Sequence, residues 1–397
     1  MKVYLDHSAT TGVDREVLDE MMPYFSEVFG NGSSQHFFGR EASKAIENAR
    51  KRVANAIGAK PSEIYFTSGG TESDNWAIKG TFFANSDKGK HIITSKIEHP
   101  AVLETLKVLS RDYGAEVTYL DVDSEGIISL DDLRNSIRED TILITIMTAN
   151  NEIGSIQPIR EIGEIAKEHN IYFHTDAVQA IGAVPIDVNA MHIDMLSMSG
   201  HKFYGPKGIG VLYRRNGLRV GKFMNGGEQE RNQRGSTHNT PGIVGIGKAI
   251  DIAVRDMDSN NKKIAELRDY FVSEVTSKIP HVRFNGPKDM SKRLQNNANF
   301  SFEFIEGESL LLRLDLAGIA CSSGSACSSG SLEPSHVLLS IGVPVEIAHG
   351  SLRFSFGKHN TREEVDYVVK NLVEVVSDLR ELSPLFKDYE EKGEYYV

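Results

Sequence analysis

Strand-like and helix-like segments alternate between residues 64 and 214, and this alternation constrains the fold more than any other feature of the sequence. Such an order is typical of a mainly parallel sheet that is covered by helices. The sequence therefore predicts an α/β domain with a mainly parallel, seven-stranded sheet. Its strands are expected at Ile64 to Thr67, His91 to Thr94, Glu116 to Leu120, Ile142 to Met147, Ile171 to His174, Met195 to Met198 and Gly210 to Tyr213.

Helices are predicted on both sides of this region. Before it, the residues between Arg40 and Arg52 are expected to form a helix with a solvated charged face. The apolar residues of this helix recur at helical spacing and would pack on a core: Ala42, Ala45, Ile46, Ala49, Val53 and Ile57. After the sheet, Asp251 to Ile279 is predicted as one long helical passage. It would connect a large domain, residues 13–258, to a smaller α+β domain made of residues 1–12 and 259–397.

The composition of the 397-residue chain excludes several functional classes. A net charge of −11 argues against a protein that coats nucleic acid, because phosphate neutralisation needs a concentrated basic surface. No uninterrupted apolar run approaches ~18 residues, so no membrane span is expected. The first residues lack the pattern of a signal peptide, and we expect a cytoplasmic protein. In a reducing compartment its two cysteines, Cys321 and Cys327, are not expected to form a disulfide or a metal site.

Lys202 lies in a turn that follows a predicted strand. The strand-like run ends at Ser199, and the turn formers of Gly200 to Pro206 come directly after it. Open α/β sheets bind ligands there, beyond the carboxyl ends of their strands. An ammonium near apolar walls and a cationic cofactor loses its proton more readily, so Lys202 is a candidate for Schiff-base formation. Taken alone, the segment would instead favour a solvated lysine.

Asp176 and Gln179 follow another predicted strand, Ile171 to His174. A carboxylate at this strand end can pair with a protonated pyridine nitrogen and keep a pyridoxal ring an electron sink. Gln179 can reach the phenolic oxygen of such a ring if the chain turns helical after Asp176. The alternative is that Asp176 caps the next helix.

A glycine turn, Ser68-Gly69-Gly70-Thr71, connects a predicted strand to a helical pattern that opens at Glu72. Free backbone N–H groups and the helix dipole favour an anion there, and glycines let it approach closely. No Gly-Lys-Ser/Thr follows, so nucleoside triphosphate hydrolysis is disfavoured. A glycine-rich connection without a ligand is the common alternative.

His99 stands directly before Pro100, which restrains its backbone to an extended conformation. At the end of a predicted strand, its imidazole can stack on a cofactor ring and relay protons near neutral pH. Most of the thirteen histidines must be bystanders, and His99 alone would be counted among them. Beside Lys202, Asp176 and the glycine turn, it adds to a set of groups that pyridoxal phosphate needs.

Cys327 lies in a loop of serines and glycines, Cys321 to Gly330. Such a loop gives a thiol reach, and a thiolate there can attack a substrate sulfur and later release it by exchange. Cys321 stands at the edge of the apolar run Leu314 to Ala320, where a small buried thiol is expected. A nucleophilic sulfur and an imine-forming lysine together indicate sulfur chemistry on a pyridoxal phosphate cofactor.

Motifs over nearly the whole chain resemble those of the cysteine desulfurases of the NifS/IscS type, in the fold-type I, class V aminotransferase-like family. The resemblance implies a pyridoxal-phosphate-dependent transferase fold with a large and a small domain. The matching motifs are Tyr4 to Thr11, Gly30 to His36, Phe66 to Ser73, Asn150 to Gly154, Ser322 to Cys327, Ser331 to Leu338 and Arg353 to Ser355.

The resemblance implies a catalytic role for several matching residues. Lys202 would hold the cofactor covalently, and His99 would stack on it and move protons. Asp176 would bind the pyridine nitrogen and Gln179 the phenolic oxygen. Cys327 would accept the sulfur.

The resemblance also implies binding residues. Asn151 and Arg353 would grip the substrate carboxylate, a task that suits a planar guanidinium. Asn151 would also contact the cofactor. The residues implied at the cofactor phosphate are Gly70, Thr71, Ser199 and His201, with Thr237 added from the neighbouring subunit of a homodimer.

The motif that contains Thr237 departs from the usual family pattern. This chain has Arg234-Gly235-Ser236-Thr237, whereas the family typically has an arginine, a small residue, a glycine and a threonine. Because the glycine comes one place early, the turn geometry is expected to differ. Arg234 keeps its place in the motif.

These observations predict a cysteine desulfurase that converts L-cysteine to L-alanine and leaves a persulfide on Cys327. The resemblance implies that the sulfur passes to an iron–sulfur assembly scaffold or to a tRNA-thiolation protein. Two alternatives remain. Another class V reaction, such as transamination or selenocysteine lysis, would use Lys202, Asp176 and His99 with no need for Cys327. A non-enzymatic iron–sulfur carrier would need more thiolates than one chain has.

Overall fold

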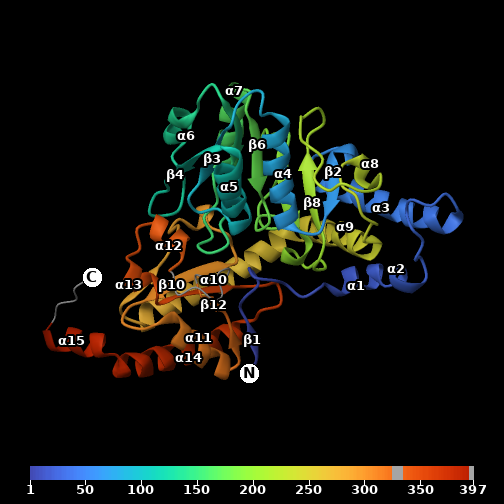
Figure 1. Cartoon of the computed structure of the whole chain (residues 1–397). Helices are drawn as coiled ribbons and strands as arrows, with labels where there is room; N and C mark the ends of the chain where they lie inside the picture. The colour runs from blue at the N-terminus through green and yellow to red at the C-terminus, as the bar shows by residue number, and fades with distance from the viewer. Residues whose placement is uncertain (324–333, 393–397) are drawn as a thin grey trace.

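A large sheet flanked by helices and a smaller group of helices and strands make up the protein (Figure 1). The computed structural model describes residues 1–323 and 334–392. The N-terminal strand and the last described helix both belong to the smaller group, which lies below the large sheet in this view. Within the described ranges, no helix is long and apolar enough to cross a membrane.

The large sheet has seven strands within the described residues, in the order β2-β8-β7-β6-β5-β3-β4. Strand β8 is antiparallel to both of its neighbours, and the other neighbouring strands run parallel. The predicted fold class is therefore confirmed. The strands are β2 (Ile64–Thr67), β3 (His91–Ser95), β4 (Glu116–Leu120), β5 (Thr141–Thr145), β6 (Tyr172–Asp176), β7 (Met195–Ser199) and β8 (Gly210–Arg214).

The sheet is buried on both faces. Alternate residues of one strand belong to different cores, as the two-residue repeat of a strand requires: Phe66 packs in one core and Tyr65 in the other. The helices of this region are α1 (Arg15–Met21), α2 (Pro23–Ser26), α3 (Phe37–Ala56), α4 (Gly70–Ala84), α5 (Pro100–Tyr113), α6 (Leu130–Ser136), α7 (Ile159–Glu168), α8 (Gln229–Asn232) and α9 (Thr240–Arg255), with short 3-10 turns η1 (Pro61–Glu63) and η2 (Gly200–Lys202).

Helix α3 packs along α9, and every apolar position predicted to face the core is buried. The prediction of a solvated charged face is wrong at Arg50, which is 3% exposed. Its guanidinium donates to Glu230 at 2.8 Å through both terminal nitrogens. A buried charge needs such a partner, and Glu230 is 180 residues away in the sequence.

The smaller group is built on a four-stranded antiparallel sheet in the order β12-β13-β10-β9. A parallel pair, β1 with β11, ties the N-terminus to it. Its own core contains Phe271, Phe300 and Phe354. The elements are β1 (Val3–Tyr4), α10 (Met257–Lys278), β9 (Val282–Phe284), η3 (Met290–Lys292), β10 (Asn297–Phe302), α11 (Gly307–Leu316), β11 (Ile319–Ala320), β12 (Ser322–Ser323), α12 (His336–Ser340), α13 (Val345–Ala348), β13 (Ser351–Ser355), α14 (Arg362–Leu382) and α15 (Pro384–Lys392).

The predicted long helical passage is interrupted at Asp256, where α9 ends and α10 begins. The backbone N–H of Asp256 caps α9 by donating to Ile252 and Val254, and its φ/ψ values are not helical. The Asp256 carboxylate holds the neighbouring Arg255 in a two-bond ion pair at 2.7 Å. The two helices lead from the large sheet to the smaller group (Figure 1). The exact domain boundaries, 13–258 and the remainder, stay a prediction.

Candidate active site

The ends of several strands bring the predicted residues to one edge of the large sheet. The register pairs Thr67 of β2 with Gly210 of β8, and Gly210 in turn with Ser199 of β7. Asp176 at the end of β6 is aligned with Ser197 of β7. The glycine turn after β2, Asp176 and the Lys202 turn after β7 therefore lie at the same edge, where open α/β sheets bind ligands.

The glycine turn is tightly enclosed. A Cβ on Gly70 would lie 2.6 Å from Cγ2 of Val178, and a Cβ on Gly210 would lie 2.6 Å from the Gly69 backbone. Helix α4 opens at Gly70, and its N-cap, Gly69, has no side chain to cap the first turn. Thr71 is the second residue of this helix. A close backbone approach and N–H groups without a side-chain cap are the features that a phosphate needs, so the turn fits the phosphate of pyridoxal phosphate.

The opening motif of the chain wraps around the Lys202 turn. Lys202 Nζ donates to the carbonyls of Ser8 and Ala9 at 2.6 and 2.9 Å. Gln179 Nε2 donates to the same Ser8 carbonyl at 3.0 Å. Lys202 and Gln179 therefore lie close together, as the sequence predicted, because both donate to the Ser8 carbonyl. Ser8 comes 194 residues before Lys202 in the sequence. Beside them, burial lowers the pKa of His201 to about 4, so this imidazole is neutral at pH 7.

Asp176 is buried and His99 is half-buried, and both lie near Lys202. His99 is the N-cap of α5 with the extended backbone that was predicted, and its Nδ1 accepts from the Ala101 N–H at 3.1 Å. Burial lowers the pKa of His99, with Asp176 opposing this shift and Lys202 adding to it. Burial raises the pKa of Asp176, whereas the charges of His99 and Lys202 and the Val178 N–H lower it. Because Nδ1 accepts a hydrogen bond from the Ala101 N–H, the neutral His99 ring carries its proton on Nε2.

Two further buried carboxyl groups next to Asp176 were missed by the sequence analysis. Burial, followed by the charge of Asp176, holds the pKa of Asp74 well above its usual range. Burial raises the pKa of Glu98 to about 8, although Glu98 accepts from Ser95 and Met147. Three carboxylates cannot all be ionised in one buried region. Burial therefore favours the protonated forms of Asp74 and Glu98, whereas the charges of His99 and Lys202 favour the ionised form of Asp176.

A neutral histidine and a serine lie beside Asp74. Nε2 of His174 lies 3.0 Å from Ser197 Oγ and 3.6 Å from Asp74 Oδ1, and its Nδ1 lies 2.8 Å from Thr145 Oγ1. Burial lowers the pKa of His174 to about 3, so this ring is neutral. The sequence signal for this cluster was the polar run of His174 to Asp176 on a strand that is buried on both faces, where each polar side chain needs a partner.

The site fits pyridoxal phosphate on its own geometry. Asp176 Oδ1 accepts from the Val178 N–H at 2.8 Å, which leaves Oδ2 available for a cationic nitrogen. The glycine turn provides the anion cradle, and Lys202 provides the amine between them. A cofactor with a pyridinium nitrogen and a phosphate at opposite ends of one ring needs a carboxylate, an anion site and an amine between them. Asp176, the glycine turn and Lys202 provide these three groups.

Arg353 and Asn151 meet beside this site. Arg353 of β13 is 2% exposed; its Nη1 donates to the Asn151 carbonyl at 3.0 Å and its Nη2 to Asp6 Oδ1 at 2.9 Å. The same Asp6 oxygen accepts from Ser322 Oγ at 2.9 Å. The buried Nε of Arg353 has no hydrogen-bond partner within the described residues. A guanidinium with an unused N–H is suited to a carboxylate.

The described residues on either side of positions 324–333 are both tied to the Arg353 region. Ser322 is held by Asp6, and Ser335 Oγ donates to Glu152 Oε2 at 2.5 Å. Burial raises the pKa of Glu152 to about 7, and the nearby Arg353 opposes this shift. The predicted sulfur acceptor, Cys327, lies outside the described residues. Cys321 is buried as expected, and burial raises the pKa of its thiol.

Thr237 is exposed and does not join the other predicted residues within one chain. Ser236, at the position where the family typically has glycine, has a φ of 107°, in the left-handed region that favours glycine. Three more residues with positive φ, Glu230 to Asn232, precede it. Glu230 holds this strained turn by accepting from Arg50, from Phe66 and from His238. The role of Thr237 stays a prediction.

The comparisons with known proteins identify the family. A family model described as aminotransferase class-V matches residues 3–368, and the chain belongs to this pyridoxal-phosphate-dependent family. A protein of Clostridium botulinum (strain Hall) named cysteine desulfurase IscS is 57% identical over 388 residues, 98% of each chain. A protein of the same name from Methanosarcina thermophila is 59% identical over 96% of this chain and 94% of its own.

Solved structures agree with this family. A structure named NifS-like protein has a TM-score of 0.90 and 41% identity, covering 96% of this chain and all of its own. A structure described as SspA in complex with cysteine has a TM-score of 0.80 and 39% identity, covering 91% of this chain and all of its own. The predicted family, fold class and cofactor are confirmed.

Proposed function

We propose that this chain is a pyridoxal-phosphate-dependent cysteine desulfurase, which converts L-cysteine to L-alanine and transfers the sulfur to Cys327. The observation that carries the proposal is the meeting of Lys202, Asp176 and His99 at one sheet edge in a class V chain. Relatives 55–59% identical to it are named cysteine desulfurase IscS. These names favour desulfuration over the transamination and selenocysteine lysis that other class V chemistry would offer.

The residues of the chain divide the work as follows. The bound cofactor supplies an electron sink for the substrate. Lys202 would hold the cofactor covalently and, when its amine is free, would remove the Cα proton of the substrate. Asp176 keeps the pyridine nitrogen protonated. His99 presents Nε2 for moving a proton, because its Nδ1 is already committed to the Ala101 N–H. The first turn of α4 binds the phosphate through its backbone.

Sulfur transfer balances without a further reactant. The Cys327 thiolate attacks the substrate sulfur, forming a sulfur–sulfur bond as the carbon–sulfur bond breaks. The electron pair of the broken bond stays with the substrate carbon, which takes a proton and yields L-alanine. The sum is L-cysteine plus a Cys327 thiol giving L-alanine plus a Cys327 persulfide. The persulfide passes its outer sulfur to an acceptor by thiol exchange.

A homodimer in the cytoplasm is part of the proposal. The segment around α2 and the start of α3 stands clear of the rest of the chain (Figure 1). It exposes Met22, Phe25, Phe29 and Phe37, each by more than half. Apolar side chains gathered in this way mark an interaction surface. An iron–sulfur assembly scaffold, or a tRNA-thiolation protein, is proposed as the sulfur acceptor.

Purified protein loaded with pyridoxal phosphate tests the proposal. L-Cysteine with a thiol reductant should yield L-alanine and sulfide in equal amounts. L-Selenocysteine and an amino-acid plus keto-acid pair serve as competing substrates. Alanine without sulfide, or preferred turnover of either competing substrate, would reject cysteine desulfuration in favour of another class V reaction.

Arg353→Lys should raise KM for L-cysteine about tenfold or more, with a smaller fall in kcat, because an ammonium cannot hold a carboxylate through two parallel bonds. Steady-state kinetics with saturating cofactor measures both parameters. Arg313→Lys is the matched control, because Arg313 on α11 is 39% exposed and paired with Asp378, away from the proposed site. Unchanged KM in Arg353→Lys would contradict the carboxylate role.

A further inference from the structure

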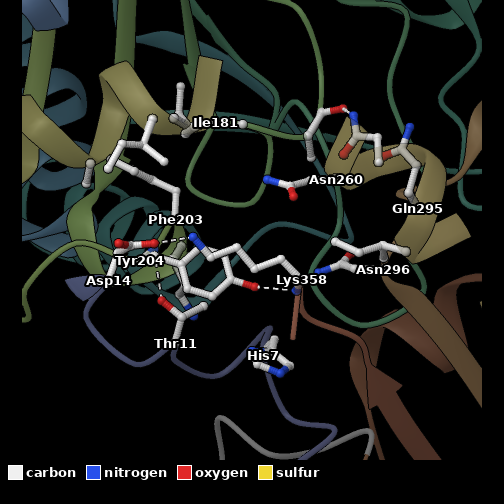
Figure 2. Close-up of a pocket in the computed structure, with 18 of the residues that line it drawn as sticks. His7, Thr11, Asp14, Ile181, Phe203, Tyr204, Asn260, Gln295, Asn296 and Lys358 are labelled. Atoms are coloured by element: carbon white, nitrogen blue, oxygen red, sulfur yellow. Dashed lines mark hydrogen bonds and ion pairs between the residues drawn. The ribbon is translucent and has the colours of Figure 1, made fainter. Parts of the chain in front are cut away.

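The smaller group reaches the proposed active site at more than one place. One is a cavity beside the Lys202 turn, with Tyr204 and Lys358 on its wall (Figure 2). Lys202 itself lines this cavity, which therefore belongs to the site already described. Another is helix α12, whose first turn lies against the two loops that carry His99 and Asn151.

These two loops are hydrogen-bonded to each other. Asn150 Nδ2 donates to the Ile97 carbonyl at 2.9 Å, and the Met147 N–H donates to Glu98 Oε1 at 3.0 Å. Both donors come from the chain that follows β5, and both acceptors come from the chain that follows β3. The two bonds fix the spacing between the loops, so the smaller group meets them as one unit.

His336, the first residue of α12, holds the loop that carries His99. Its Nε2 donates to the Glu98 carbonyl at 3.1 Å, and Glu98 directly precedes His99. The Glu98 side chain is held in turn at Oε1, by Ser95 Oγ at 2.6 Å and by the Met147 N–H. The backbone from which the His99 ring projects is therefore fixed by the smaller group as well as by the large sheet.

Ser335, the N-cap of α12, holds the loop that carries Asn151. Its Oγ donates to Glu152 Oε2 at 2.5 Å and accepts from the N–H groups of Val337 and Leu338. A hydroxyl has a single O–H donor, and here that donor goes to Glu152. Glu152 is buried and directly follows Asn151, so this contact also acts on the neighbour of a proposed site residue.

Apolar packing completes the contact between α12 and the loops. Val337 and Leu338 share one small buried core with Ile97 of the first loop and Ile153 of the second. Burial of these side chains holds the helix against the loops independently of the polar contacts. Each hydrogen bond can therefore be removed singly without detaching the helix.

We propose that the first turn of α12 is a positioning element of the active site. His336 orients His99 for proton transfer, and Ser335 orients Asn151 for binding of the substrate carboxylate. The inference rests on the proposed roles of His99 and Asn151. It gives the smaller group a part in the reaction beyond Arg353, with a different effect expected from each of the two contacts.

Single variants separate the two contacts. His336→Ala should lower kcat for L-cysteine about tenfold and leave the Kd for L-alanine within about twofold. Ser335→Gly removes the other donor, while glycine still serves as an N-cap; it should raise the Kd for L-alanine about tenfold, with a smaller change in kcat. Absorption titration of the holoenzyme measures this Kd. L-Alanine carries no sulfur, so its binding does not depend on sulfur transfer to Cys327.

Conservative variants should restore each contact. His336→Gln keeps a side-chain N–H donor and Ser335→Thr keeps the hydroxyl, so each should return kcat and Kd toward the values of the unmodified enzyme. Leu339→Ala changes an exposed residue of the same helix, and His349→Ala changes an exposed histidine of the smaller group. Both controls should leave kcat and Kd unchanged. Thermal unfolding checks that every variant is folded.

Two results would overturn the inference. The first is that His336→Ala and Ser335→Gly change kcat and Kd by the same factor, which would mean that α12 only stabilises the fold of the site. The second is that neither variant changes either quantity, which would mean that packing alone places the loops. The desulfurase proposal fails on a different observation, the products of the unmodified enzyme, so the two failures are distinguishable.

Discussion

Replacement of Lys202 by alanine is expected to abolish L-cysteine turnover, with a loss of about 10³-fold or more, as when a covalent catalyst is removed. Lys202 follows β7 at the sheet edge where Asp176 and the glycine turn also lie. No other lysine takes part in the geometry described there. The variant loses both the covalent hold on the cofactor and the group that moves the Cα proton.

A nearby lysine provides the control for this experiment. Lys207 is exposed in the same turn region, and Lys207→Ala should keep activity close to that of the unmodified enzyme. L-Alanine production is measured at saturating pyridoxal phosphate, and the absorption spectrum reports cofactor retention separately. Substantial turnover by Lys202→Ala, at wild-type cofactor content, would contradict the assignment of Lys202.

The sequence predicted the parts of this site that depend on local order along the chain. Lys202, Asp176, His99 and the glycine turn each follow a strand, and parallel strands bring such positions to one sheet edge. The seven strands were predicted because short apolar runs alternate with helical patterns over 150 residues. Pro100 fixed the extended backbone of His99 directly.

The parts that were missed depend on contacts between distant segments. Arg50 looks like a surface charge in the sequence, and only its pairing with Glu230 explains its burial. Asp74 lies on the helix after the glycine turn, where a carboxylate is common in sequence and uninformative. Its proximity to His174 and Ser197 arises from the packing of α4 against the sheet. The helix break at Asp256 was missed because no proline or glycine marks it.

The second large expected effect on activity concerns the two cysteines, whose surroundings differ. Cys321 belongs to the core of the smaller group, and burial raises the pKa of its thiol far from the range in which a thiolate forms. Cys327 lies outside the described residues, in the serine- and glycine-rich stretch between Ser322 and Ser335. Those two flanking serines are held by Asp6 and Glu152, so the described residues on both sides of this stretch lie beside Arg353.

Cys327→Ser should therefore retain the cofactor and still bind L-cysteine, as judged by the change in the absorption spectrum, while forming no persulfide and losing about 10²-fold or more of its sulfide production. Cys321→Ser should keep most of its activity, because a serine of similar size replaces a buried thiol whose pKa burial raises. Mass spectrometry after incubation with L-cysteine should find an added sulfur on the Cys327 peptide in the unmodified enzyme and in Cys321→Ser. Added sulfur on the Cys321 peptide alone would show that the buried thiol is the acceptor, and the roles assigned to the two cysteines would have to be exchanged.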